Sequence, residues 1–302
     1  MQHKPRYFWA VMAAGIIGIA FGSILIKLAT AAPLAIACYR MLFTIALLAP
    51  VYAIRRGRCR FSSADLGWTA LAGVFLSLHF VLWIYSLNFT SVTSSVVFVT
   101  TNPLFVTILG WLLFRERSSR GLLLAVALVI AGGLVIAGRS AFTSDARANL
   151  GNLLALSGAV MASGYLLAGR RLRPRVDIIT YTTVCYGITA LILLASCFVF
   201  RVSLFEFDKV NYLWFLLAAL GPQLLGHSSF NWGLKYWPAS RIAMLIITEP
   251  VGATILAYLI LNQRPSLYEV LGGLLIMAGV YLSVRDGDAC AAVTQRERSD
   301  AA

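Results

Sequence analysis

The amino-acid sequence predicts an all-α integral membrane protein with ten transmembrane helices, arranged as two inverted five-helix repeats. Three observations support this prediction: the composition, the number of long apolar segments and an internal repeat. Apolar residues make up 60% of the 302 residues and charged residues only 12%, whereas soluble domains carry about 25% charged residues. A soluble fold of this length could not bury so much apolar surface, so the bilayer is the expected environment.

Ten apolar segments are long enough to cross a bilayer, which requires about 20 residues. In the first half they are 8–28, 33–54, 66–87, 91–114 and 121–138, and in the second half 150–168, 178–200, 211–233, 240–261 and 268–284. Each is expected to be a helix, because lipid satisfies no backbone hydrogen bonds and the segments are too long for barrel strands. We assign residues 1–140 to the first repeat, 141–285 to the second and 286–302 to a disordered tail.

The basic residues predict the orientation of the chain. Eighteen Lys and Arg residues lie on the side of the two termini and five on the other side, so both termini are expected in the cytoplasm, with the chain in the cell inner membrane. This bias also accounts for the net charge of +13, and nucleic acid is not an expected partner, because the basic residues form no single face with exposed aromatic residues. The five scattered cysteines indicate no disulfide framework and no metal site.

An internal repeat appears when the chain is compared with itself at an offset of 147 residues. At this offset, eleven residues of the first half are identical to their partners in the second half. Among them are Thr101 with Thr248 and Pro103 with Pro250. Because each copy contains five helices, an odd number, the second copy must enter the bilayer from the opposite side. Two inverted halves can exchange conformations, which is the basis of alternating access in many transporters.

The matched prolines indicate where the helices are interrupted. Proline inside a helix removes a backbone hydrogen bond, which is tolerated at membrane depth only beside a cavity or a compensating partner. Polar residues precede both prolines, Asn102 before Pro103 and Thr248 with Glu249 before Pro250. The pair indicates a binding site near the midplane, and packing kinks are the alternative interpretation.

Glu249 is the only carboxylate deep within a predicted span. A charge there costs about 3 kcal/mol on insertion scales unless it is paired, hydrated or protonated. It is therefore a candidate for binding a proton or a substrate ammonium group, and a structural hydrogen bond or ion pair is the alternative.

Further polar and aromatic residues lie within the spans. Gln223, His227 and Asn231 recur every four residues and predict one polar stripe facing a cavity. His79 and Trp83 follow the same spacing in the third span, although either histidine could be a packing residue. Trp83 and Tyr165 are candidates for stacking on a ring of the substrate, with core packing as the alternative.

Two basic residues lie near span ends, Lys27 in the first span and Arg40 in the second. Either side chain could extend to water. Alternatively, each could pair with Glu249 or bind a substrate carboxylate, for which arginine has the better bidentate geometry.

The chain resembles the EamA-type branch of the drug/metabolite transporter superfamily. The resemblance covers residues 8–284 and rests on short motifs whose order is kept in both copies: Phe21-Gly22-Ser23, Lys27, Arg40, Asn102-Pro103, Arg115-Glu116-Arg117, Gly226-His227, Asn231-Trp232, Pro238-Ala239-Ser240, Glu249-Pro250, Gly272-Gly273 and Ala278-Gly279. Gln263 stands where the family usually has an acidic residue. The resemblance implies a ten-helix exporter of small metabolites or amino acids in a bacterial inner membrane, and YddG-like exporters of aromatic amino acids are the most similar group.

Two other classes of function have less support in the sequence. The sequence has no Walker A pattern and no GxGxxG motif, so no cofactor is expected and the partners are a small-molecule substrate, the lipid bilayer and, if transport is coupled, protons. An intramembrane enzyme could use His79, His227 and Glu249, but no HExxH or GxSxG motif supports it. A membrane scaffold without transport activity would leave the paired prolines without a reason.

Overall fold

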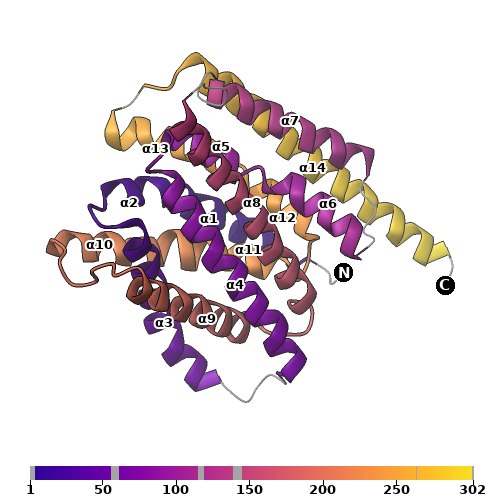
Figure 1. Cartoon of the computed structure of the whole chain (residues 1–302). Helices are drawn as coiled ribbons and strands as arrows, with labels where there is room; N and C mark the ends of the chain where they lie inside the picture. The colour runs from indigo at the N-terminus through magenta and orange to yellow at the C-terminus, as the bar shows by residue number, and fades with distance from the viewer. Residues whose placement is uncertain (1–3, 56–60, 115–118, 139–144, 263, 301–302) are drawn as a thin grey trace.

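The computed structural model describes residues 4–55, 61–114, 119–138, 145–262 and 264–300, which form helices and their connections (Figure 1). The described helices of the first half are α1 (Phe8–Ala20), α2 (Gly22–Leu28), α3 (Pro33–Arg55), α4 (Ser63–Ser86), α5 (Val92–Val99), α6 (Asn102–Phe114) and α7 (Arg120–Ala137). Those of the second half are α8 (Ala146–Leu172), α9 (Ile178–Val199), α10 (Lys209–Ala218), the π-helix η2 (Ala219–His227), α11 (Ser228–Gly233), α12 (Ala239–Ile246), α13 (Glu249–Leu261) and α14 (Leu267–Asp300).

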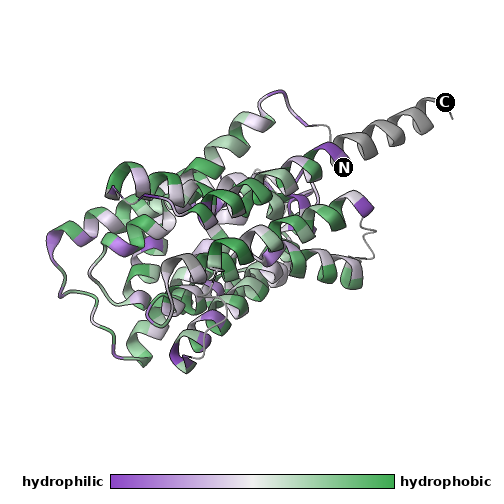
Figure 2. Ribbon diagram, turned by 90° about the horizontal axis from the view of Figure 1, so that it is seen from above, coloured by the Kyte–Doolittle hydropathy of each residue, from purple (hydrophilic) through white to green (hydrophobic). Residues whose placement is uncertain are grey.

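Within the described ranges, nine helical segments are long and apolar enough to cross a membrane. Hydrophobic residues make up most of the length of the helices, and hydrophilic residues gather at several helix ends and in connections (Figure 2). The predicted eighth span, residues 211–233, is divided among α10, η2 and α11 rather than forming one continuous α-helix. The all-helical membrane fold is therefore confirmed, and the count of ten spans stays a prediction.

The last helix is longer than the predicted last span. α14 continues to Asp300, past residue 286, where the sequence predicts a disordered tail. The backbone there is helical instead of irregular, and its residues include alanine, glutamine, glutamate and arginine, which favour helix. The motif residues Arg115, Glu116 and Arg117, and also Gln263, lie outside the described residues.

Two spans are interrupted directly before the matched prolines. α5 and α6 are separated at Thr100 and Thr101, before Pro103, and α12 and α13 at Ile247 and Thr248, before Pro250. A proline in the first turn of a helix loses no hydrogen bond, because the first N–H groups have no partner within the helix. The prolines therefore begin new half-helices in the middle of the span.

The π-helix η2 corresponds to a one-residue difference between the two copies. Trp68 in α4 and Trp214 in α10 are 146 residues apart, whereas Thr101 and Thr248 are 147 apart. The second copy thus carries one additional residue between these points, and a π-helical turn accommodates it by widening the helix. The widened turn packs closely on α1, where a Cβ atom on Gly18 would lie 2.9 Å from the carbonyl oxygen of Gly221.

The outer helices α7 and α14 lie side by side (Figure 1). They approach so closely that a Cβ atom on Gly132 would lie 2.6 Å from the carbonyl oxygen of Gly272. α4 packs along both α8 and α9, and α3 packs along α9. Both described chain ends lie toward the same end of the molecule (Figure 1), as expected for an even number of crossings.

Candidate functional site

A buried chamber lies at the centre of the bundle, lined by eight residues of the first half and eight of the second. The charged and hydrogen-bonding side chains among them include Arg40, His79, Thr100, Asn102, His227 and Glu249. Trp83, Tyr165 and Phe230 contribute aromatic walls. Because helices of both halves build the chamber, a movement of one half against the other would change its shape.

Arg40 lies two turns into α3 and is 1% exposed. Its Nε donates a hydrogen bond of 3.0 Å to Oε1 of Gln223 in η2, and its guanidinium carbon lies 4.5 Å from the centre of the Phe80 ring. Its Nη2 has no hydrogen-bond partner among the described residues. The side chain is therefore held in place at one nitrogen, while a second nitrogen is left without a partner in the chamber.

Glu249 is the first residue of α13 and is 5% exposed. Its Oε1 accepts no hydrogen bond from any described residue. Gly22 lies beside it, where a Cβ atom would be in ordinary van der Waals contact with Oε1 at 3.6 Å. Arg40 and Glu249 line the same chamber, and within the described part of the chain no ion pair joins them. The two opposite charges thus share one buried chamber without a direct salt bridge, although buried charges are normally in direct contact with a partner.

Asn102 occupies the position of Glu249 in the other copy, because it is the first residue of α6 and the two are 147 residues apart. It also lines the chamber, and its Oδ1 has no partner among the described residues. Its carbonyl oxygen accepts a hydrogen bond of 3.2 Å from Ser163 of α8. Two half-helices therefore begin at the chamber, where their first N–H groups carry partial positive charge.

His79 and His227 face each other across the halves, with ring centres 6.4 Å apart. Nδ1 of His79 lies 3.0 Å from the carbonyl oxygen of Gly158. Since that oxygen can only accept, Nδ1 carries the proton and Nε2 is left as an acceptor in the neutral ring. The ring of His79 is also stacked parallel to Trp83, with centres 6.0 Å apart.

Asn231 supports the chamber from behind. Its Nδ2 donates hydrogen bonds to the hydroxyl oxygens of Tyr165 and, over 3.0 Å, of Tyr186. Tyr186 is in turn hydrogen-bonded to Ser228 over 3.2 Å. This arrangement fixes the orientation of Tyr165, which is the member of the group that lines the chamber.

The structure brings together seven of the candidate side chains predicted from the sequence: Arg40, His79, Trp83, Asn102, Tyr165, His227 and Glu249. Gln223 and Asn231 stand behind the chamber, so the predicted stripe of three cavity-facing residues is wrong for two of them. The expectation assumed a regular α-helix, and η2 interrupts it. Pro103 and Pro250 do not line the chamber themselves. They stand in the first turns of the half-helices whose first residues, Asn102 and Glu249, line it.

The two remaining polar candidates are also outside the chamber. Thr248 donates a hydrogen bond of 2.7 Å to the carbonyl of Leu245 within its own chain segment. Lys27 is exposed near the end of α2, as expected for a side chain that extends to water, whereas Arg40 is buried and does not.

Several wall residues were not anticipated, namely Thr100, Pro222 and Phe230, together with Phe80 beneath Arg40. Phe230 and Trp83 are 147 residues apart. The repeat was therefore the signal that could have identified Phe230. No group of three or more metal-binding side chains occurs among the residues that the structure describes.

The family model of EamA-like transporters matches the chain twice, over residues 4–138 and 149–285. The chain therefore belongs to the EamA-like transporter family and is a multi-pass membrane transporter. An uncharacterized transporter of Synechocystis sp. is 25% identical over 222 residues, which cover 71% of this chain and 66% of that protein. An uncharacterized transporter of Archaeoglobus fulgidus is 26% identical over 292 residues, which cover 92% of this chain and 98% of that protein.

A solved structure supports the fold alone. It superposes with a TM-score of 0.77 at 18% sequence identity and covers 93% of this chain and 97% of its own. The resemblance to this family drawn from short motifs is thus confirmed, because the matches extend over both halves of the chain.

Proposed function

We propose that this transporter exports small amphipathic metabolites, most favourably amino acids and among them aromatic ones, across the cell inner membrane. Transport proceeds by alternating access around the chamber, with both termini in the cytoplasm. The central observation is that Arg40 and Glu249 are buried in one chamber with opposite charges, and each has an atom without a partner. An amino acid carries one carboxylate and one ammonium group, which complement this pair of side chains.

The aromatic preference follows from the walls between these two charges. Trp83, Tyr165 and Phe230 offer large apolar surfaces, and Nε1 of Trp83 has no described partner. Stacking on such rings contributes about 1 kcal/mol beyond the burial of area. An indole or phenyl side chain therefore gains more from this chamber than an aliphatic side chain of similar size.

Coupling to protons is a further part of the proposal. Glu249 is accessible to the substrate only inside the chamber, so it can exchange an ammonium ion for a proton as the chamber changes sides. The two copies differ here, because Asn102 cannot carry a proton. One carboxylate in the chamber lining gives an exchange of one proton for one substrate molecule.

Flux into liposomes tests this function. Purified protein is reconstituted, and uptake of labelled tryptophan, phenylalanine, leucine and a purine is compared with uptake into empty liposomes. Saturable flux that favours the two aromatic amino acids is expected. Equal flux of the purine would refute the substrate class, and flux of leucine equal to that of tryptophan would refute the aromatic preference.

A further inference from the structure

Two polar residues occupy equivalent positions at the beginnings of α4 and α10. Asp65 is the third residue after the N-cap Ser62 of α4, and Asn211 is the third after the N-cap Asp208 of α10. They are 146 residues apart, the same offset that relates Trp68 to Trp214. Both are almost completely buried. The equivalence suggests a common role in the two copies.

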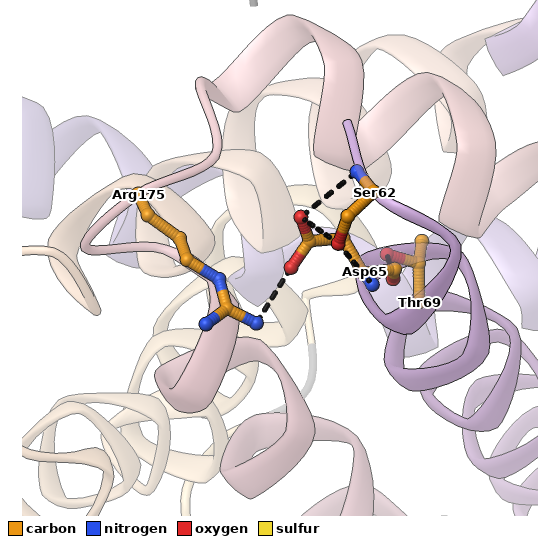
Figure 3. Close-up of polar contacts among 4 residues, drawn as sticks. All are labelled: Ser62, Asp65, Thr69 and Arg175. Atoms are coloured by element: carbon orange, nitrogen blue, oxygen red, sulfur yellow. Dashed lines mark hydrogen bonds and ion pairs between the residues drawn. The ribbon is translucent and has the colours of Figure 1, made fainter. Parts of the chain in front are cut away.

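Asp65 joins the first half to the second. Its Oδ1 lies 2.6 Å from Nη2 of Arg175, in the connection between α8 and α9 (Figure 3). Its other oxygen accepts hydrogen bonds from the backbone N–H and hydroxyl of Ser62, over 3.1 and 2.7 Å. The carboxylate is thus oriented by its own helix cap toward the arginine of the other half.

The connection that carries Arg175 is itself fixed to the second half. Nε of Arg173 donates a hydrogen bond of 3.0 Å to the carbonyl of Asn231, and Nη1 of Arg170 donates one of 2.8 Å to the carbonyl of Leu234. Arg175 therefore moves with α8 and α11. A displacement of α4 relative to them would separate Asp65 from Arg175.

Asn211 makes the corresponding contact in the opposite direction. Its Oδ1 accepts a hydrogen bond of 2.8 Å from the backbone N–H of Thr30, and its Nδ2 donates one of 3.1 Å to the Thr30 hydroxyl. Thr30 lies in the connection after α2, three residues before α3 begins at Pro33. Arg175 likewise lies three residues before α9 begins at Ile178.

The two contacts lie at opposite ends of the molecule. α4 begins beside the connection that follows α8, next to the end of α11, and the same end holds the beginning of α1, where Phe8 packs against Trp237. α10 begins beside the end of α2. A tilt of one half about the chamber that separates one contact would therefore leave the other one closed.

We propose that the Asp65–Arg175 and Asn211–Thr30 contacts are two alternating latches that decide from which side the chamber opens. Release of the first opens the chamber to the end that holds the chain termini, and release of the second opens it to the opposite end. Both latches are closed in this structure, in agreement with the burial of Arg40 and Glu249. The inference rests on the proposed alternating access and names the residues that control it.

The latches differ in their chemistry. The first is an ion pair whose arginine is 54% exposed, so salt screens it. The second is a neutral hydrogen-bonded pair, which salt affects little. High salt on the side of the termini is therefore expected to favour opening to that side only.

Side-specific labelling of the chamber tests the proposal. A Thr100→Cys variant places a reporter in the chamber wall, and a membrane-impermeant maleimide is added to right-side-out or inside-out vesicles, with the chain lacking the reporter as background. Asp65→Asn and Arg175→Gln are each expected to raise labelling from the terminus side about threefold to fivefold relative to the other side, as removal of a partly exposed ion pair allows. Asn211→Leu is expected to shift labelling the other way.

Ser266→Ala is the matched control, because it removes the corresponding cap hydroxyl at the start of α14, to which the N–H of Glu269 donates over 3.2 Å, and leaves both latches intact. It is expected to leave the ratio of labelling unchanged. An equal rise from both sides in Arg175→Gln, or the same shift in Ser266→Ala as in Asp65→Asn, would overturn the proposal. The labelling requires no substrate, so a failure to transport tryptophan would not be confused with a failure of the latches.

Discussion

Replacing Arg40 by glutamine is expected to weaken binding of amino acids, while an amine without a carboxylate should bind as before. Gln223 holds Nε over 3.0 Å and Phe80 supports the guanidinium plane at 4.5 Å, so Nη2 is oriented before the substrate arrives. A hydrogen bond between charged groups contributes about 1.5–3 kcal/mol, which corresponds to roughly a 10- to 150-fold increase in Kd for tryptophan.

The assay compares three ligands on the same purified protein. Equilibrium binding of tryptophan, tryptamine and indole-3-propionate is measured for the wild type, Arg40→Gln and Glu249→Gln. Arg40→Gln should weaken binding of tryptophan and indole-3-propionate, and Glu249→Gln should weaken binding of tryptophan and tryptamine. Melting temperatures are measured in parallel, because each substitution removes one of two opposite buried charges and can lower stability. The comparison between ligands on the same variant isolates the effect on binding.

The result that would refute this reasoning is an equal loss for tryptamine and tryptophan in Arg40→Gln. That outcome would show that Arg40 maintains the shape of the chamber instead of binding a carboxylate. Arg40→Lys provides a graded control, because it keeps the charge and loses the planar group that lies over Phe80. It should bind tryptophan with an affinity between those of the wild type and Arg40→Gln.

Three further predictions concern the chamber and the packing around it. Glu249→Gln should abolish the pH dependence of tryptophan exchange in liposomes, and an unchanged pH profile would rule out this residue as the proton carrier. Asn231→Leu removes the donor to the hydroxyl of Tyr165. Because an unsatisfied buried group costs about 1–3 kcal/mol, tryptophan should bind about 10-fold more weakly. Wild-type affinity in a binding titration would show that Asn231 does not position Tyr165 for binding. Gly132→Leu should abolish the folded, monodisperse peak in size-exclusion chromatography because α7 and α14 leave no space, whereas Gly67→Ala, with nothing within 4 Å, should elute like the wild type.

The positions of the membrane-spanning helices could be predicted from the sequence because the bilayer imposes one strong requirement. A span must be apolar and must satisfy its own backbone, so the apolar segment 33–54 corresponds closely to α3, Pro33–Arg55. The interruptions before Pro103 and Pro250 could be predicted for the same reason, since proline cannot continue a helix in lipid without compensation.

The details of the chamber depend on features that apolar patterns do not record. One additional residue in the second copy produces η2, which turns Gln223 toward Arg40 and places Asn231 behind Tyr165. The spacing of four residues therefore predicted that Gln223 and Asn231 face the chamber, whereas both lie behind it. The change of offset from 146 to 147 was present in the sequence, and comparing the copies helix by helix would have located it.

The contrast between Lys27 and Arg40 illustrates a second limit. Both lie near span ends, but Lys27 is one residue from the end of α2, whereas Arg40 is seven residues from the start of α3 at Pro33. The longer distance places Arg40 among the packed helices, where Gln223 accepts a hydrogen bond from its Nε. Which partner faces a given residue follows from the tertiary packing and could not be predicted from one sequence.

Counterflow of tryptophan tests the central claim most directly. Liposomes that contain the protein are loaded with excess unlabelled tryptophan and diluted into labelled tryptophan at low concentration. Alternating access around a single chamber predicts a transient accumulation of label above its external concentration, because each outward movement of unlabelled substrate returns the chamber to take up label. Flux of label that only approaches the external concentration, without any overshoot, would contradict alternating access and indicate a continuous pore.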